Sequence, residues 1–235
     1  MAMSRIAIVA AFEREVGALI EGAKPVQRDH AGRSFTFFEQ DDRVLVCGGI
    51  GAEGARRAAE AAILLYHPVL LQSVGFAGAL ERNLQVGDIF SPALVLDARD
   101  GSRTPIPGGK GILLTFMAVA GKQQKLSLAR SYSAQAVDME AAAVAAAARA
   151  KGIEFHAVKV ISDTLDFEMP ETARFIDSHG HFNTGRFAVF VALRPWLWKR
   201  VATLAGNSRK AAKALASYLK GSCPPLGDPL EAKIT

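Results

Sequence analysis

The sequence predicts an α/β fold, namely a single-domain three-layer α/β/α sandwich around a central mixed β-sheet. Short apolar runs rich in Val, Ile and Leu alternate along the chain with alanine-rich segments of helical periodicity. These apolar runs are continuous, which is typical of strands that helices cover on both faces. The length of 235 residues suits one such domain, which we expect at 1–221, followed by a C-terminal tail at 222–235.

The expected elements follow one another in a regular order. Apolar runs predict strands at 5–10, 44–50, 69–76, 86–96, 111–116 and 154–163. Alanine-rich segments predict helices at 13–23, 52–66 and 137–152. Gly, Pro and charged residues predict surface loops at 97–110 and 166–185, the second with room for a short helix inside it. Helical periodicity returns from Pro195 to Gly221, and we expect a break at Gly206 and Asn207, a pair that can end one helix and cap the next.

Composition excludes several classes of protein. A charged fraction of 22% and a mean hydropathy of +0.16 exclude a disordered, collagen-like or coiled-coil chain. The sequence has no run of about 18 uncharged apolar residues to cross a bilayer. Cys47 and Cys223 suggest neither a disulfide framework nor a metal site, and Glu13 interrupts the apolar start too early for a signal peptide. We therefore expect the protein in the cytoplasm.

Three segments that follow predicted strands are candidates for ligand binding, because open α/β sheets bind ligands at the carboxyl ends of their strands. Glu13 and Glu15 follow the first strand, where they either serve a site or only favour the start of a helix. Glycine-rich segments at 48–51 and 75–78 follow two further strands. Each is either a tight turn or a place where the backbone approaches a ligand closely.

Two further segments carry acidic residues at element boundaries. Asp138, Met139 and Glu140 open the predicted helix at 137–152, and Ser162 and Asp163 end the last predicted strand. An acid at the end of a buried strand, beside a hydroxyl, suits a general acid, since partial burial favours its protonated form. The plainer alternatives are that Asp163 caps a turn and that Met139 packs in the core. From the residues alone, Asp163 is the strongest catalytic candidate.

Metal-assisted and serine-based chemistry are not indicated. The histidines at 30, 67, 156, 179 and 181 show no metal-ligand spacing, and the sequence has no GxSxG segment. We therefore predict no metal and no cofactor.

Taken in order, four segments resemble the nucleoside phosphorylase and nucleosidase superfamily, and within it the methylthioadenosine/S-adenosylhomocysteine nucleosidases. The segments are IAIVAAFEREV (6–16), GGIGAEGA (48–55), SVGFAGALERNLQVGDI (73–89) and AVDMEAAAVAAAARAKGIEFHAVKVISDTLD (136–166). The VDMEA and ISD motifs, with GFAG and VGDI upstream, carry the resemblance. It implies a phosphorylase/hydrolase-like fold, a homo-oligomer in the form of a dimer, and cleavage of the N-glycosidic bond of a purine nucleoside.

The resemblance also implies roles for individual residues. Asp163 would protonate the purine at N7, and Ser162 would orient Asp163. Glu140 would take the ribose hydroxyls, and Met139 would lie against the sugar. Glu15 corresponds to the glutamate that activates water in the nucleosidases, and a carboxylate there also stabilises a cationic sugar.

Departures from the phosphorylase pattern favour water over phosphate as the nucleophile. Glu15 and Ser73 stand where phosphorylases carry phosphate-binding arginines, and Phe76, beside Gly75 at the expected substrate surface, replaces a serine. A phosphate dianion near Glu15 without those cations costs about 1 to 4 kcal/mol per charge pair. Arg14 is expected to point away from the site. We therefore predict a nucleosidase that releases adenine from a 5′-substituted adenosine. Phosphorolysis, with phosphate as co-substrate, and a non-catalytic nucleoside-binding protein are the alternatives.

The C-terminal segment adds a finer resemblance and a second partner. RFIDSHG (174–180) and LRPWLWKRVATLAGNSRKAAKAL (193–215) resemble the hopanoid-associated branch, which implies a substrate such as adenosylhopane. The basic excess behind the net charge of +5 lies here, because no acidic residue stands between Asp177 and Asp228. Trp196 and Trp198 lie among these cations. The segment is either a docked helix with a solvated basic face or a peripheral contact with the inner face of an anionic membrane, and nucleic acid is not an expected partner.

Overall fold

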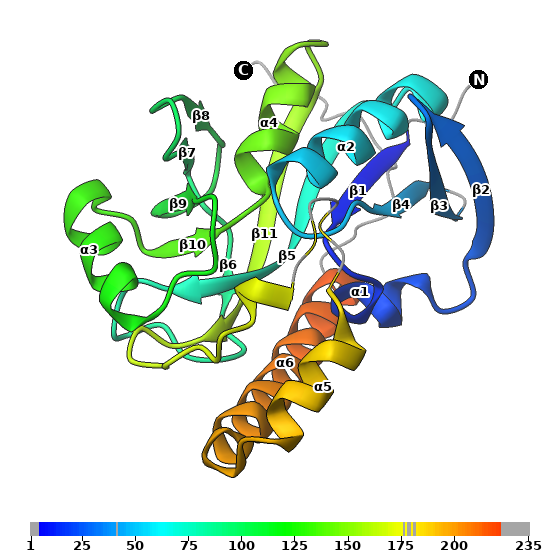
Figure 1. The fold of residues 1–235 in the computed structure, drawn as a ribbon. Coiled ribbons are helices and arrows are strands. Elements are labelled where there is room, and N and C mark those ends of the chain that lie inside the picture. The colour runs from blue at the N-terminus through cyan, green and yellow to red at the C-terminus, as the bar shows by residue number, and fades with distance from the viewer. Residues whose placement is uncertain (1–4, 41, 176, 178–179, 181, 222–235) are drawn as a thin grey trace.

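The structure, a computed structural model, describes residues 5–40, 42–175, 177, 180 and 182–221, so the predicted tail at 222–235 lies outside the described residues. An 11-stranded mixed sheet runs through the molecule (Figure 1). Its strands are β1 (Ile6–Ala10), β2 (Lys24–His30), β3 (Arg33–Glu39), β4 (Arg43–Cys47), β5 (Leu70–Ala79), β6 (Ile89–Phe90), β7 (Leu94–Asp97), β8 (Arg103–Pro105), β9 (Ile112–Thr115), β10 (Ala136–Asp138) and β11 (Glu154–Asp163).

The order of the strands brings the ends of distant segments together. It is β2-β3-β4-β1-β5-β10-β9-β7-β8, and β11 pairs with both β5 and β6. β1 lies parallel to β4 and β5, β11 lies parallel to β5, and β10 runs antiparallel to β5. The carboxyl ends of β1 and β11 therefore meet at one edge of the sheet, where a ligand site is expected.

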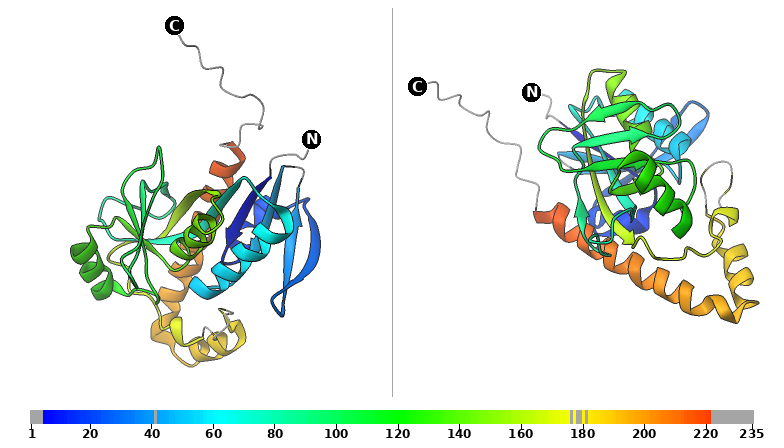
Figure 2. Two further views of the ribbon diagram at one scale, coloured as in Figure 1. Left: turned by 90° about the horizontal axis from the view of Figure 1, so that it is seen from above. Right: turned by 90° about the vertical axis from the view of Figure 1, so that its left-hand side faces the viewer.

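Helices cover both faces of the sheet, which confirms the predicted three-layer sandwich (Figures 1 and 2). On one face, α2 (Ala52–Tyr66) packs against α4 (Ala141–Arg149) through alanines, whose small side chains allow close approach. On the other face, α1 (Glu13–Ile20) and α6 (Pro195–Gly221) pack against each other and bury a separate apolar cluster. None of the described helices is long and apolar enough to span a bilayer.

Strand β5 corrects the prediction for residues 75–78. The expected turn is wrong, because β5 continues through Ala79 with β11 on one side and β10 on the other. Gly78, for example, aligns with Asp163 of β11 and with Val137 of β10. The same pairing corrects the helix predicted from 137, since residues 136–138 form β10 and α4 begins at Ala141.

The C-terminal segment also differs from the prediction. α6 is one helix of 27 residues, so the break expected at Gly206 and Asn207 is wrong. A glycine inside a helix costs only about 1 kcal/mol, less than the burial of Leu197, Leu215 and Leu219 along the same helix contributes. The short 3-10 helix η1 (Ala173–Phe175) confirms the helix expected inside 166–185, whereas α3 (Lys122–Tyr132) and α5 (Thr184–Ala192) were not predicted.

A hairpin of β2 and β3, also not predicted, forms one edge of the sheet. Ala31 and Gly32 connect the strands with φ values of 49° and 74°, as a two-residue hairpin turn requires. β2 is mostly exposed and carries Lys24, Pro25 and several polar residues. Charge and proline on an edge strand discourage pairing with another chain.

Candidate active site

A cavity of about 720 Å³ opens beside the carboxyl ends of β1, β10 and β11 and next to residues 76–78 of β5. The predicted residues Glu15, Met139, Glu140, Ser162, Asp163 and Phe76 all line it. Gly75 does not line the cavity itself but lies directly beside Glu15. The sequence therefore located this cavity, although the segments that form it are far apart in the chain.

An irregularity in β11 allows two consecutive side chains to reach the cavity. Ile161 aligns with Ala77 and Asp163 with Gly78, so Ser162 is an extra residue in the pairing. In a regular strand, successive side chains point to opposite faces, and such a bulge redirects one of them. Ser162 Oγ lies 2.8 Å from Asp163 Oδ2 and 3.3 Å from the Ala77 carbonyl oxygen. The hydroxyl thus fixes the orientation of the Asp163 carboxylate.

Asp163 also has a cationic partner that the sequence analysis did not anticipate. The Lys125 ammonium donates to Asp163 Oδ1 and, at 2.8 Å, to the Thr164 carbonyl oxygen. Lys125 is 1% exposed, and it lines the cavity with Asp163. A Cβ on Gly78 would lie 3.1 Å from both Asp163 Oδ1 and Lys125 Cε, so a glycine here makes room for the pair. Asp163 is therefore a member of a buried ion pair with Lys125 as well as a partner of the Ser162 hydroxyl.

Glu15 lies in the first turn of α1 and is 5% exposed. Burial, and next the negative charge of Glu140, raise the pKa of Glu15 to about 7, while Lys159 acts in the opposite direction. A Cβ at Gly75 would lie 2.7 Å from Glu15 Oε2, so only glycine leaves space for this carboxylate. Glu15 is thus held close to the backbone of β5 in a state that titrates near neutral pH.

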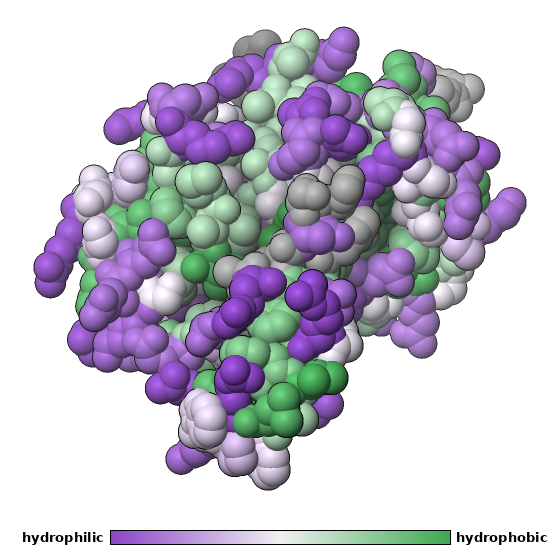
Figure 3. Space-filling view, viewed as in Figure 1, coloured by the Kyte–Doolittle hydropathy of each residue, from purple (hydrophilic) through white to green (hydrophobic). Residues whose placement is uncertain are grey.

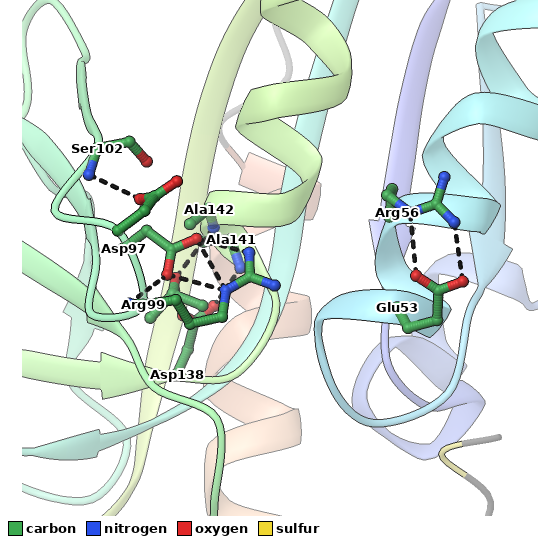
Figure 4. Close-up of polar contacts among 10 residues, drawn as sticks. Glu53, Arg56, Asp97, Arg99, Ser102, Asp138, Ala141 and Ala142 are labelled. Carbon is green, nitrogen blue, oxygen red and sulfur yellow. Dashed lines mark hydrogen bonds and ion pairs between the residues drawn. The ribbon is translucent and has the colours of Figure 1, made fainter. Parts of the chain in front are cut away.

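Glu140 is held by the turn between β10 and α4. Its Oε1 accepts from the Gly51 amide at 2.8 Å, and its Oε2 accepts from the Met139 amide at 3.2 Å. Burial and the negative charge of Asp138 raise the pKa of Glu140 to about 7. Asp138 itself accepts from the Ala141 amide at 2.8 Å at the start of α4 (Figure 4). Asp138 is thus tied to the start of α4, and it lines the cavity together with Glu140.

A second buried lysine, Lys159 of β11, lies beneath the carboxylates. Its ammonium lies 2.9 Å from Asp138 Oδ2 and donates to Ser73 Oγ at 3.0 Å. Burial lowers its pKa, but the charges of Asp138, Glu140 and Glu15 outweigh burial and raise it. Ser73 is the position at which the sequence analysis inferred a lost cation. The neighbouring strand places the Lys159 ammonium beside Ser73, where it is buried, paired with Asp138 and not part of the cavity lining.

The opposite wall of the cavity is mainly apolar and comes from later segments. Ala118, Val119 and Ala120 line it before α3, where the sequence analysis made no assignment. From the C-terminal region it receives Met169, Phe182, Phe187, Val201, Leu204 and Ala205. Phe187 packs edge-on against both Phe175 and Phe182, which fixes this wall. Arg14 also lines the cavity, with its guanidinium 4.4 Å from the centre of the Phe12 ring, so the expectation that it points away is wrong.

Histidines take no part in the cavity lining among the described residues. His156 pairs with Glu154, and His67 ends α2. His179 and His181 lie outside the described residues. Within the described part of the chain, no group of three or more His, Cys, Asp or Glu residues is arranged to hold a metal ion. The absence of a metal and of a cofactor stays a prediction.

The mixed sheet is covered on both faces, and buried acids and lysines lie around one cavity at the ends of its strands. This arrangement defines an α/β enzyme suited to acid–base chemistry. The family model of the phosphorylase superfamily matches residues 5–116 and 90–191, which together span most of the chain. The chain therefore belongs to the phosphorylase superfamily and is a nucleosidase or nucleoside phosphorylase, as the sequence motifs predicted. No curated protein matches it in sequence.

Solved structures show the same fold. The 5′-methylthioadenosine/S-adenosylhomocysteine nucleosidase of Helicobacter pylori, solved with butyl-thio-DADMe-Immucillin-A, is 17% identical, with a TM-score of 0.70 over 94% of this chain and 98% of that chain. Futalosine hydrolase of Helicobacter pylori is 17% identical, with a TM-score of 0.68 over 93% and 96%. The 5′-methylthioadenosine/S-adenosylhomocysteine nucleosidase of Neisseria meningitidis, in complex with methylthio-immucillin-A, is 18% identical, with a TM-score of 0.69 over 92% and 97%.

Proposed function

We propose that this protein is a nucleosidase that cleaves the N-glycosidic bond of a 5′-substituted adenosine, with water as the nucleophile and adenine as the product. One observation carries the proposal: Glu15, Glu140 and Asp163 come from separate elements and line a single cavity, and Glu15 and Asp163 are buried. Hydrolysis of a glycosidic bond needs one carboxyl group at the leaving group and another at the attacking water. The volume of about 720 Å³ is typical of a small-molecule site.

Asp163 serves the leaving group. It passes a proton to N7 of the purine, which converts the base into a better leaving group as the C1′–N9 bond breaks. Lys125 holds the carboxyl group of Asp163 through Oδ1, while Ser162 holds Oδ2. Lys125 thus acts as a positioning residue for Asp163.

Glu15 and Glu140 serve the sugar and the water. Glu140 accepts hydrogen bonds from two backbone amides and binds the ribose hydroxyls, and Met139 lies against the sugar. Glu15 takes a proton from water as the oxygen attacks C1′. A general base works best when its pKa is close to the working pH, and the pKa of Glu15 is raised to about 7. The same carboxylate stabilises the positive charge that develops on the sugar.

The 5′ substituent faces the apolar wall formed by Phe187, Val201 and Leu204. Contact with this wall favours an apolar substituent over a charged one, because a charge there would lose its hydration without a partner. An adenosylated triterpenoid such as adenosylhopane is the largest substrate of this kind that the motifs imply.

Phosphorolysis is the second candidate, and one observation favours it. Arg14 and Arg209 both line the cavity, and both are exposed at its opening. These guanidinium groups offer cations to a phosphate at the mouth of the site. Hydrolysis remains the proposal because the phosphate would have to approach Glu15.

Adenine release distinguishes these functions. Purified protein is incubated with methylthioadenosine, S-adenosylhomocysteine and an adenosylated lipid, each with and without phosphate. We expect adenine and a free sugar at equal rates in both conditions. Strict dependence on phosphate, with a sugar phosphate as product, would replace the proposal by phosphorolysis. Tight binding without release from any of these nucleosides would replace it by a nucleoside-binding protein.

A homodimer in the cytoplasm is part of the same proposal. Met117 is 75% exposed beside the cavity-lining residues Ala118 and Val119, which suits a position that a second copy covers. Sedimentation velocity should give the mass of a dimer, and Met117→Glu should lower the dimer fraction.

A further inference from the structure

α5 and α6 form a helical hairpin. The end of this hairpin at which the two helices are connected, its closed end, projects beyond the sheet (Figures 1 and 2). α5 has the apolar sequence TGRFAVFVA, yet none of its residues is buried. It packs on α6 and η1 rather than on the sheet. An apolar helix of this kind on the outside of a protein indicates a surface that something else covers.

The closed end of the hairpin exposes large apolar side chains, which we call the tip patch: Val189, Leu193, Trp196 and Trp198. They are 63%, 71%, 72% and 55% exposed, respectively. The Trp198 indole donates to the Val191 carbonyl oxygen at 3.0 Å, so this ring is held against the end of α5. Figure 3 shows apolar surface beside hydrophilic residues on this part of the molecule.

The tip patch is surrounded by cations. Arg186, Arg194, Lys199 and Arg200 lie in the same two helices and their connection, and the sequence has no acidic residue from 178 to 227. Arg186, Lys199 and Arg200 form no ion pair with another described residue. The Arg194 guanidinium lies 3.9 Å from the centre of the Phe190 ring. The surface therefore combines exposed tryptophans with the positive charge of Arg186, Lys199 and Arg200, which no ion pair among the described residues neutralises.

We propose that the tip patch docks on an anionic lipid surface, with Leu193 and Trp196 in the interface and the arginines and lysines at the headgroups. Tryptophan favours the membrane–water interface, and basic residues are attracted to the negative potential of an anionic lipid surface. A second copy of the chain fits this surface less well. A symmetric pair would bring the cations of both copies together without an acidic partner.

The position of the tip patch also bears on the substrate, a step that rests on the proposed function. α6 carries Trp198 at the tip, Val201 of the cavity wall about one turn further on, and Leu204 of the same wall about two turns further on. One turn is about 5 Å along the axis of a helix. A nucleoside whose apolar 5′ substituent stays in the bilayer therefore has a short path into the site, so lipid-linked nucleosides are the substrate class that docking favours.

The two tryptophans of the chain both belong to the tip patch, so intrinsic fluorescence reports directly on docking. Full-length protein is titrated with phosphatidylcholine vesicles, with and without phosphatidylglycerol. We expect a blue shift and co-sedimentation only with the anionic vesicles, both reversed by raised salt. No shift and no co-sedimentation with anionic vesicles at low salt would overturn the proposal.

Variants separate docking from folding and from catalysis. Leu193→Ser/Trp196→Ser should lower the vesicle-bound fraction about tenfold, with Trp198 retained as the probe, and Lys199→Glu/Arg200→Glu should do the same. Leu64→Ser, at a 58% exposed position on α2, and Lys151→Glu after α4 are matched controls that should bind like the wild type. Equal binding by the tip variants would overturn the proposal, as would a fall in their lipid-free oligomeric mass.

Adenine release from soluble methylthioadenosine is followed in parallel, and the tip variants should keep the wild-type rate because none of these residues lines the cavity. A wild type that docks but releases no adenine would refute the proposed function and leave the docking surface standing. A wild type that releases adenine but does not dock would refute the docking surface and leave the proposed function standing.

Discussion

The two walls of the cavity differ in origin and in burial. The polar wall comes from strand ends and the first turns of helices, and its acids, Glu15 and Asp163, are 5% and 4% exposed. The apolar wall comes from the C-terminal helices, and α5 has no buried residue. Deep burial makes each polar group depend on its neighbours, whereas the outer wall can change without disturbing the sheet. We infer that the polar wall performs the chemistry and that the apolar wall selects the substrate.

The largest effect is expected at the leaving group. Asp163→Asn should lower kcat for adenine release about 10²- to 10⁴-fold, because Asn cannot pass a proton to the purine. Asp166→Asn is the matched control, since Asp166 is an exposed carboxylate that pairs with Arg82 and Lys122. Its rate should stay close to that of the wild type. A fully active Asp163→Asn enzyme would show that Asp163 is not the general acid.

The ion pair behind Asp163 should affect stability as well as rate. Lys125→Met should lower the free energy of unfolding by about 3 to 5 kcal/mol, because a buried carboxylate loses its partner. Urea unfolding measures this change. Lys122→Met on the same helix is the control, since Lys122 is 40% exposed, and should change stability by less than about 0.5 kcal/mol. The double variant Lys125→Met/Asp163→Asn should recover part of the loss, and additive losses would show that the two residues do not interact.

The pH dependence of the rate tests Glu15. A general base must be ionised, so kcat/KM of the wild type should rise as the pH increases through about 7. Glu15→Gln should lower the plateau about 100-fold and make the rise shallower, because Glu140 titrates in the same range. Glu13→Gln, at an exposed neighbour, should keep both the plateau and the rise. An unchanged profile in Glu15→Gln would exclude Glu15 as the base.

The same carboxylate should make the fold less stable at high pH. The pKa of Glu15 is raised from an ordinary value of 4.5 to about 7, so between these pH values the folded state binds more protons than the unfolded state. Stability contributed by this group is therefore lost as the pH rises. At pH 8, Glu15→Gln should unfold with a free energy higher than that of the wild type by on the order of 3 kcal/mol, and at pH 4 the difference should vanish. Glu13→Gln should match the wild type in urea unfolding at both pH values.

The smallest effect is expected at the apolar wall. Leu204→Ser should raise KM about tenfold for an adenosine with an apolar 5′ substituent, because one apolar contact is lost. The KM for adenosine itself should change little. Ala202→Ser, at an exposed position of the same helix, is the control. An equal rise for both substrates would mean that this wall does not distinguish the 5′ group.

Sequence reasoning identified the cavity-lining residues that lie next to strand ends. Asp163 and Glu15 follow apolar strands that are evident from the sequence, and parallel strands bring their carboxyl ends together. The buried lysines were missed because charge predicts exposure, and only the tertiary structure supplies the acids that pair with them. A weak signal exists for Lys125, since it stands three residues before Leu128, the other buried residue of α3.

Long-range pairing explains the errors in the fold. Residues 75–78 have the composition of a turn, and they remain in a strand only because β10 and β11 pair with them. Gly206 and Asn207 have the composition of a helix break, but apolar residues before and after them hold α6 on the body of the protein. In both cases a tertiary contact overrides a local preference.

Strand β5 has a further consequence, for the synthesis of the chain. Its partners β1, β10 and β11 come from the beginning, the middle and the later part of the sequence. Until β11 has left the ribosome, one edge of β5 has no partner, and its buried residues such as Leu71 and Val74 stay accessible. We therefore expect the nascent chain to fold late. Until residue 163 has emerged, chaperones would have to shield the apolar residues of β5.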